Sequence, residues 1–394
     1  MSTPPRRRVY KGRGASAGRR VNSLKTNGNL IDEGKAPATG ASPILIVPYM
    51  WIGDFVRCHS VVRLLKARFP DRPVDVLTTA MVAPLLDYMP GVRKGIVFDL
   101  PRKRLALSSH RALADRLRTE GYGDALIMPR TWKSALAPAL AGIPVRTGFV
   151  GEMRFGLIND LRPGEKALPR MVDRCAALAL PKHAALPADW PHPQLVVPRE
   201  EVSRWRERTG LTDTRPVAVV APGAVGPSKR WPAAAYAELA GQLGERGFSV
   251  WVIGGPQEQA LAAEIGAPSP DCRDLTGPDL RNAILALASA DVAISNDSGL
   301  LHVAAALGTP SIGIFGPTSP WHWAPLNPLA AVIEPKTEVP CRPCHKPTCR
   351  FGHHRCMRDI SAGQVMAAVV AALGEARCHK NRDGQDKPGH DDLL

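Results

Sequence analysis

Short apolar runs alternate with longer segments of helical spacing along most of this 394-residue chain. In the first half, apolar residues recur at helical intervals around Val61–Leu65 and again at Leu113 and Leu117. Strand, helix, strand in this rhythm predicts a parallel sheet covered by helices. The predicted strands of this half are 44–47, 74–78, 95–98, 125–128 and 145–149.

The alternation stops at a proline-rich stretch, "LPKHAALPADWPHPQLVVP" at 180–198, and then resumes. We therefore predict two doubly wound α/β domains, with a ligand cleft between them. The predicted boundaries are an N-terminal domain at 43–190, a linker at 191–212 and a C-terminal domain at 213–376. The predicted elements of the second half are strands 217–221, 250–253, 292–295, 311–315 and 331–333, and helices 232–246, 257–265, 280–289, 299–307 and 361–373.

Composition and charge narrow the class of protein. A hydrophobic content of 44% is that of a soluble globular protein, and no apolar run approaches the roughly 20 residues that span a bilayer. The basic N-terminus has no apolar segment behind it, so we expect a cytoplasmic protein. Residues 1–42 and 377–394 are polar and are predicted to be disordered tails. The net charge is +15, of which the N-terminal tail carries +7, and the remaining basic bias favours an anionic partner without naming it.

A carboxylate stands at the first strand-to-helix junction, in "ILIVPYMWIGDFVRCHSVVRLL" at 44–65. Gly53 permits a tight turn there, and Asp54 follows it. Asp54 has two interpretations that do not exclude each other. It caps the helix, or it faces the cleft at the C-terminal end of the strand.

Two further junctions have anion-binding character. In "APGAVGPSKRWP" at 221–232, Gly223 allows close backbone approach and Lys229 adds positive charge before a helix. The alternative is an ordinary loop with solvated cations. In "ISNDSGLLHVAAALGTP" at 294–310, Asp297, Ser298, Gly299 and His302 crowd one helical turn. The alternatives are a good N-cap and a packed histidine.

Weaker signals follow two other strands. Glu258 in "VIGGPQEQ" is suited to a ribose diol, although a solvated glutamate explains it equally well. A GxGxxG fingerprint is absent from the sequence, which argues against nicotinamide or flavin binding.

The segment "CRPCHKPTCRFGHHRC" holds four cysteines: Cys341, Cys344, Cys349 and Cys356. Four thiols within sixteen residues fit a structural zinc site with no open position. A set of reduced thiols remains the alternative, and a metal- and nucleic-acid-binding protein is a remote one. No recognition module accompanies the charge, so we expect no nucleic-acid partner.

These motifs together resemble a known family. "PYMWIGDFV", "MPRTWKSALAPALAGIPVRTGFVGEMRFGLIND", "PGAVGPSKRWP" and "NDSGLLHVAAALGTPSIGIFGPTSP" are similar to the ADP-heptose:lipopolysaccharide heptosyltransferases of glycosyltransferase family 9, in their heptosyltransferase II branch. The resemblance covers roughly residues 43–374. It implies a GT-B fold of two facing Rossmann-like domains and an inverting, metal-independent enzyme. That enzyme would transfer heptose from ADP-L-glycero-beta-D-manno-heptose to the lipopolysaccharide inner core. The alternatives are another nucleotide sugar or another core acceptor position.

The resemblance also assigns roles residue by residue. Asp54 matches the catalytic base, and Gly53 beside it leaves room for a sugar. The matching donor-site positions are Gly223, Lys229, Glu258, Thr276, Gly277, Asp297, Ser298, Gly299 and His302. The matching acceptor-side cations, expected to meet phosphates and acidic sugars, are Lys133, Arg146 and Arg154. No cofactor is implied beyond the possible structural zinc. The basic tail suggests peripheral contact with the anionic inner face of the cytoplasmic membrane, with a merely solvated tail as the alternative.

Overall fold

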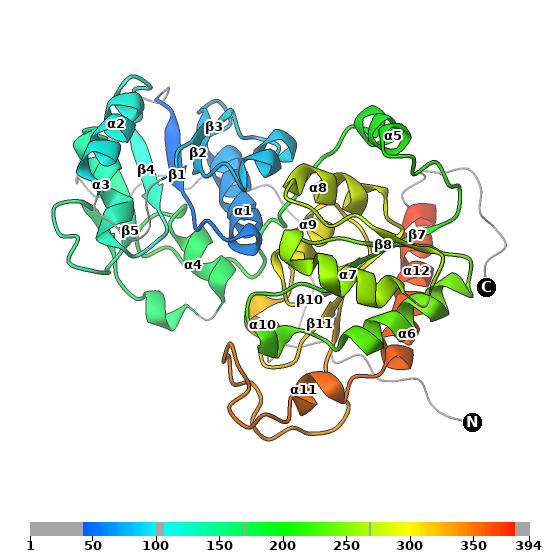
Figure 1. Ribbon diagram of the computed structural model, residues 1–394. Coiled ribbons are helices and arrows are strands. Elements are labelled where there is room, and N and C mark those ends of the chain that lie inside the picture. Colours follow the sequence, from blue (N-terminus) through cyan, green and yellow to red (C-terminus); the bar gives the residue numbers. More distant parts are fainter. Residues whose placement is uncertain (1–41, 100–105, 169, 268, 383–394) are drawn as a thin grey trace. The chain divides into compact units, whose positions relative to one another are not determined.

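The computed structural model describes residues 42–99, 106–168, 170–267 and 269–382 (Figure 1). The predicted N-terminal tail, apart from Ser42, lies outside these residues, as does 383–394. Both halves of the described chain are α/β, as the alternation of apolar runs predicted. Among the described residues, no helix is both long and apolar enough to cross a membrane.

The first half forms a six-stranded, fully parallel sheet with the strand order β3-β2-β1-β4-β5-β6. This is the Rossmann order, in which the direction of winding reverses between β1 and β4. Its strands are β1 (Ile44–Val47), β2 (Val74–Thr78), β3 (Lys94–Val97), β4 (Asp124–Ile127), β5 (Val145–Phe149) and β6 (Asp160–Arg162). Its helices are α1 (Ile52–Arg68), α2 (Leu107–Arg118), α3 (Trp132–Leu140) and α4 (Met171–Ala177).

The second half repeats this topology. Its parallel sheet has the order β12-β11-β10-β7-β8-β9, so the reversal falls between β7 and β10. Its strands are β7 (Val217–Ala221), β8 (Ser249–Val252), β9 (Cys272–Asp274), β10 (Val292–Asn296), β11 (Ser311–Ile314) and β12 (Ala330–Ile333). Its helices are α6 (Ala233–Gly244), α7 (Gln259–Gly266), α8 (Leu280–Ser289), α9 (Gly299–Ala306), α10 (Pro320–Trp323), α11 (Arg355–Arg358) and α12 (Ala362–Arg382).

Two predicted boundaries differ from the structure. The predicted linker 191–212 contains a helix, α5 (Arg199–Arg208). Trp205 of this helix is buried, donates a 3.0 Å hydrogen bond to Asn282 and packs edge-on against Trp251. The segment is therefore packed onto the second half. The predicted tail from 377 also begins inside a helix, because α12 continues to Arg382.

One apolar cluster joins the two halves. It contains Phe55 and Val56 of α1 together with Val303 and Ala304 of α9, all almost fully buried. Helices α1 and α9 therefore pack directly against each other (Figure 1). Because α1 follows β1 and α9 follows β10, this packing brings the points of reversal of the two sheets together. Ligands of such sheets bind there, beyond the carboxyl ends of the strands.

Candidate functional site

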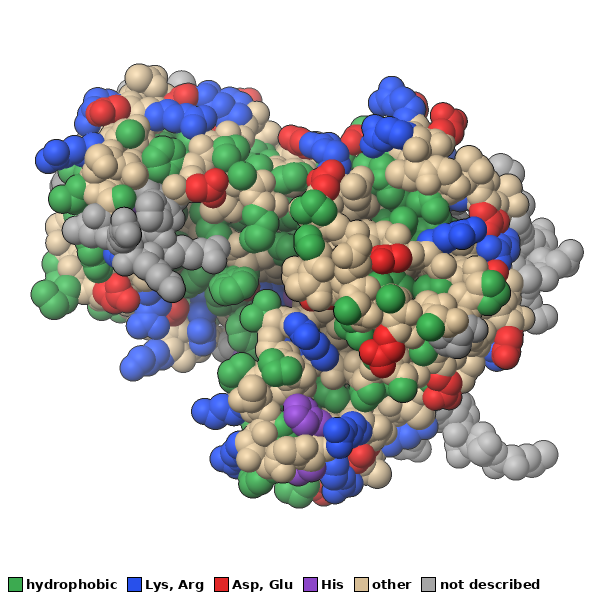
Figure 2. All heavy atoms as spheres, viewed as in Figure 1, with side chains coloured by type: hydrophobic (Ala, Val, Ile, Leu, Met, Phe, Trp, Pro, Cys, Tyr) green, Lys and Arg blue, Asp and Glu red, His purple; other side chains and the backbone are tan. Residues whose placement is uncertain are grey.

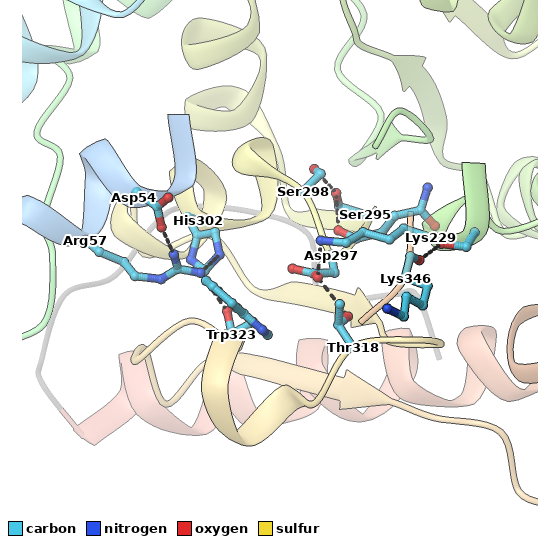
Figure 3. Close-up of polar contacts among 12 residues, drawn as sticks. Asp54, Arg57, Lys229, Ser295, Asp297, Ser298, His302, Thr318, Trp323 and Lys346 are labelled. Atoms are coloured by element: carbon cyan, nitrogen blue, oxygen red, sulfur yellow. Dashed lines mark hydrogen bonds and ion pairs between the residues drawn. The ribbon is translucent and has the colours of Figure 1, made fainter. Parts of the chain in front are cut away.

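Asp54 lies in the first turn of α1 and is bonded to a neighbour in the same helix. The helix begins after Trp51, and Asp54 makes no capping bond to its N-terminus. Its carboxylate instead pairs with Arg57, three residues further on. The helix-cap interpretation of Asp54 is therefore wrong. The acid is held by a partner on its own helix face (Figure 3).

Arg57 links this acid to the second half of the chain. Its guanidinium donates to Asp54, to Nε2 of His302 at 2.8 Å and to the carbonyl of Trp323 at 3.0 Å. It also lies over the Trp323 ring, 5.3 Å from the centroid. A guanidinium has no acceptor, so His302 must accept through Nε2 and carry its proton on Nδ1. Sequence reasoning missed Arg57 because two of its partners, His302 and Trp323, lie far away in the chain.

Glycines permit this close packing of α1 and α9. A Cβ on Gly53 would lie 2.8 Å from the His302 ring, and one on Gly299 would lie 2.6 Å from Cβ of Ile52. We predicted that Gly53 leaves room for a sugar and that Gly299 is part of the donor site. In the structure, the space beside both glycines is filled by protein. Their small size is needed for contact between the two helices.

Lys229, Asp297 and Thr318 form a second polar cluster, contributed by the loops after β7, β10 and β11. Lys229 Nζ and Thr318 Oγ1 each donate to the same carboxylate oxygen of Asp297, both at 2.8 Å. Asp297 is 7% exposed, whereas the Lys229 side chain is 28% exposed. Lys229 therefore has one face against the acid and another toward solvent. Thr318 was not predicted from the sequence.

The N-cap interpretation of 296–298 is correct for the position of Ser298 but not for its bonding. Ser298 occupies the cap position of α9 but makes no capping bond, and its hydroxyl lies 2.9 Å from that of Ser295. Asn296 bonds to the backbone of Pro222 and Trp231 instead. These partners leave the first N–H groups of α9 without a side-chain cap from this motif. Such groups attract anions.

The electrostatics of the two clusters are coupled. Burial raises the pKa of Asp54 above its ordinary value, and Arg57 opposes this, while the charges of Asp297 and Lys229 also act on it. Burial lowers the pKa of His302 well below its ordinary value, with Arg57 and Lys229 acting in the same direction. His302 is therefore neutral, as its hydrogen bond from Arg57 requires. Asp54 is in electrostatic range of the Lys229–Asp297 pair.

The other predicted donor residues line the loops after β7, β8 and β9. Glu258 is buried, and its Oε2 accepts a 2.9 Å bond from the N–H of Gly255. A Cβ on Gly223 would lie 2.9 Å from the Glu258 carboxyl, so this glycine accommodates Glu258. Thr276 bonds to Asp274 through both its N–H and its hydroxyl, and Gly277 donates to the carbonyl of Gly254.

Two of the three predicted acceptor-side cations bond to backbone carbonyls. Arg154 is 1% exposed, and its guanidinium donates to the carbonyls of Phe149 and Pro129. Arg146 donates to the carbonyls of Ile143, Leu157 and Gly156. The prediction that Arg154 meets acceptor phosphates is corrected, because its guanidinium is buried among backbone carbonyls. Arg146 is only partly buried, and its role on the acceptor side stays a prediction. Lys133, in the first turn of α3, remains partly exposed.

A pocket of about 140 Å³ adjoins the Arg57–His302 contact. Residues of both halves line it, including Val56, Arg170, Trp321 and His322. Asp54 and Lys229 are not among its lining residues. The pocket therefore adjoins the site through Arg57 and His302 without including the acid or the lysine.

The four cysteines of the segment are near one another. All four are free thiols, and Cys356 is buried. Cys341 Sγ lies 3.8 Å from Nε2 of His353 in the same segment. Among the described residues, no three His, Cys, Asp or Glu side chains are grouped to hold a metal ion. Burial raises the pKa of Cys356 to about 11 and the charges of Cys341, Cys344 and Cys349 add to this, so the other three thiols lie within electrostatic range of Cys356. The structural zinc stays a prediction.

Two Rossmann-type sheets joined at their points of reversal, with an acid from one and a lysine–acid pair from the other, define a GT-B nucleotide-sugar glycosyltransferase. Comparison with known proteins agrees. Residues 110–355 match the family described as glycosyltransferase family 9 (heptosyltransferase), and the chain belongs to this family.

Relatives match nearly the whole folded chain. Lipopolysaccharide heptosyltransferase 2 of Escherichia coli (strain K12) is 38% identical over 84% of this chain and 98% of its own length. The protein of the same name from Salmonella typhimurium is 39% identical over 84% and 99%. The solved structure of E. coli ADP-heptose lps heptosyltransferase II superposes with a TM-score of 0.76, at 36% identity over 85% of this chain and 99% of that one.

Proposed function

We propose that this enzyme transfers heptose from ADP-L-glycero-beta-D-manno-heptose to the inner core of lipopolysaccharide, with inversion at the anomeric carbon. The names of the relatives support this substrate class. The observation that carries the proposal is that the Asp54–Arg57 pair of the first half contacts His302 of the second half. Asp54 follows the central strand of the first sheet, and the charges of Asp297 and Lys229 in the second half act on its pKa.

In this proposal Asp54 removes the proton from the acceptor hydroxyl as it attacks. A base is most effective when its pKa is not far below the working pH, and burial has raised the pKa of Asp54. Arg57 keeps the carboxylate oriented and limits that rise. Inversion requires the attacking hydroxyl and the leaving diphosphate to lie on opposite faces of the sugar. An acid and a cation contributed by opposite halves meet that requirement.

The leaving diphosphate gains negative charge, which the second half would stabilise. Lys229 supplies an ammonium group, and Ser298, Gly299 and their backbone N–H groups at the start of α9 supply hydrogen bonds. Asp297 holds Lys229 in place, and His302 holds Arg57. Glu258, Thr276 and Gly277 are proposed to contact the nucleoside. These groups provide the charge stabilisation without a metal ion.

On the acceptor side, Lys133 and Arg146 are the predicted cations that are not fully buried, and we propose that they meet inner-core phosphates. The acceptor is membrane-linked, so we also propose peripheral association with the inner face of the cytoplasmic membrane through the basic segment 1–42. A variant that starts at Ala41 should bind anionic vesicles less tightly than the full chain. Equal binding by the two would remove the role of this segment.

The proposal is tested by incubating the enzyme with a panel of ADP-, UDP- and GDP-sugars and a series of truncated core acceptors. Mass spectrometry would detect products, and proton NMR would report the anomeric configuration. We expect one added heptose, only from the ADP-heptose donor, with the α linkage that inversion of a β donor produces. Turnover of a different nucleotide sugar would change the donor assignment. Retention of configuration would remove Asp54 from its role as base.

A further inference from the structure

The cysteine-rich segment 341–356 forms one wall of the Lys229–Asp297–Thr318 cluster. On one side, the N–H groups of Cys344 and His345 donate to the carbonyl of Pro317, which precedes Thr318, at 3.0 and 2.9 Å. On the other side, Ser228, which precedes Lys229, donates to the carbonyls of Lys346 and Pro347 at 2.5 and 3.1 Å. Residues 344–347 therefore bridge the two loops that hold Asp297.

The contact with the Lys229 loop is close. Gly226 has φ +94°, and a Cβ there would lie 3.1 Å from the carbonyl oxygen of Pro347. The segment also carries Lys and Arg side chains onto the surface before α11 (Figure 2). In Figure 3 the Lys346 side chain extends toward the side of the site where Thr318 and Asp297 lie. Lys346 is solvent-exposed, as a ligand-binding cation must be.

The ion pairs already in the site leave no net positive charge to neutralise a diphosphate. Lys229 is paired with Asp297, and Arg57 is paired with Asp54, so these four charges cancel. His345 does not add a charge at neutral pH, because burial, His322 and Lys229 all lower its pKa. Among the described side chains, no carboxylate is within ion-pair distance of the Lys346 ammonium. An additional cation is therefore available at this wall.

We propose that Lys346 is a second diphosphate-binding residue, delivered to the donor site by the cysteine-rich segment. The proposal rests on the nucleoside diphosphate sugar being the donor. It also gives a role to the segment's packing. By bonding to the Pro317 and Ser228 loops at once, the segment fixes Lys346 relative to Lys229, so that the two ammonium groups bind the same diphosphate from different sides.

The test measures ADP and AMP binding by calorimetry to the wild-type enzyme and to Lys346→Ala and Lys346→Arg. Loss of a charge-assisted contact should weaken ADP binding roughly 10- to 100-fold. AMP binding should change much less, because AMP lacks the β-phosphate. Lys346→Arg should restore most of the affinity. Lys336→Ala, which removes an exposed lysine elsewhere in this half, is the matched control and should behave as wild type.

Each outcome has a distinct meaning. Unchanged ADP binding by Lys346→Ala would overturn the role of Lys346 while leaving the proposed reaction intact. Equal weakening of ADP and AMP would show that the residue supports the loop and does not contact the β-phosphate. Failure of the wild-type enzyme to bind ADP, together with failure to transfer heptose, would contradict the proposed function itself.

Discussion

Replacing Arg57 by Met would remove the bond that orients Asp54 and the polar link between α1 and α9. The two side chains of this pair are 8% and 14% exposed. Methionine keeps much of the volume but none of the three donated hydrogen bonds. The variant therefore leaves a carboxylate that is mostly buried and has no cation beside it.

The size of the effect follows from this burial. Removing one partner of a buried ion pair costs about 3–5 kcal/mol. Asp54 can avoid part of that cost by binding a proton, and each 1.36 kcal/mol recovered in this way corresponds to a tenfold increase in proton affinity. Burial already raises the pKa of Asp54, and Arg57 is the largest influence that lowers it. Loss of Arg57 therefore raises this pKa further. If about 1.4 kcal/mol of the cost is recovered, the acidic limb of the activity profile moves about one pH unit upward.

The assay is the pH dependence of kcat/KM, with a thermal melt at each pH. A base must be deprotonated, so activity is lost as pH falls, and in Arg57→Met this loss should begin at higher pH. The folded-state pKa exceeds the unfolded value, so protonation stabilises the fold. The Tm deficit of the variant should therefore be smallest at low pH and grow as pH rises through that pKa. Arg63→Met, on the same helix but exposed and bonded to a carbonyl, is the control.

An acidic limb at the same pH in Arg57→Met and in the wild-type enzyme would refute this reasoning. So would a Tm deficit that is independent of pH. Either result would mean that Arg57 does not control the protonation of Asp54.

Three further predictions follow from the packing. Gly299→Ala places a methyl group 2.6 Å from Ile52, so it should destabilise the fold by about 1–3 kcal/mol in a thermal melt and greatly lower the rate of sugar transfer. Gly241→Ala, whose methyl group meets nothing within 4 Å, should change neither stability nor activity. Arg154→Ala should lower Tm, because it leaves buried carbonyls unpaired at a cost of about 1–3 kcal/mol for each group. The KM for the acceptor should not rise selectively, and a selective rise would restore the predicted role of Arg154 as a phosphate ligand. If Cys341–Cys356 hold the predicted structural zinc, elemental analysis should find one metal ion per chain and chelation should lower Tm; absence of both results would favour a set of reduced thiols.

The sequence predicted the two parallel sheets well because their central strands are continuous apolar runs. It missed β6 and β9, which are three-residue strands with the polar sequences DLR and CRD. Both are edge strands, so they are only partly covered and need no apolar run. Helix α5 was hidden for a related reason, because it buries Trp205 and little else and follows several prolines.

The candidate site was only partly accessible to sequence reasoning. Strand ends located Asp54, Lys229 and Asp297, because parallel strands place their following loops at one edge. The contacts that Arg57 and Thr318 make with distant parts of the chain could not be inferred from local pattern. Arg57 reaches a histidine 245 residues away, and Thr318 lies 21 residues from the acid that it bonds.

Sequence reasoning assigned a wrong role to Arg154 because its surroundings in the fold are unusual for a loop arginine. A charged residue in a loop is usually solvated, but the carbonyls of the loop after β5 surround Arg154 and satisfy its guanidinium. Glycines were ambiguous too. A glycine such as Gly53 indicates that another group can lie close to the backbone, but only the structure shows that this group is the His302 ring.

The central claim is that Asp54 is the base of an inverting heptosyl transfer. Single-turnover transfer by Asp54→Asn, measured beside donor binding, tests it most directly, with the exposed Asp115→Asn as control. We predict that transfer falls by about 10² to 10⁴, that ADP-heptose binds nearly as tightly as to the wild-type enzyme, and that the control is unaffected. Transfer by Asp54→Asn at near the wild-type rate would contradict the account.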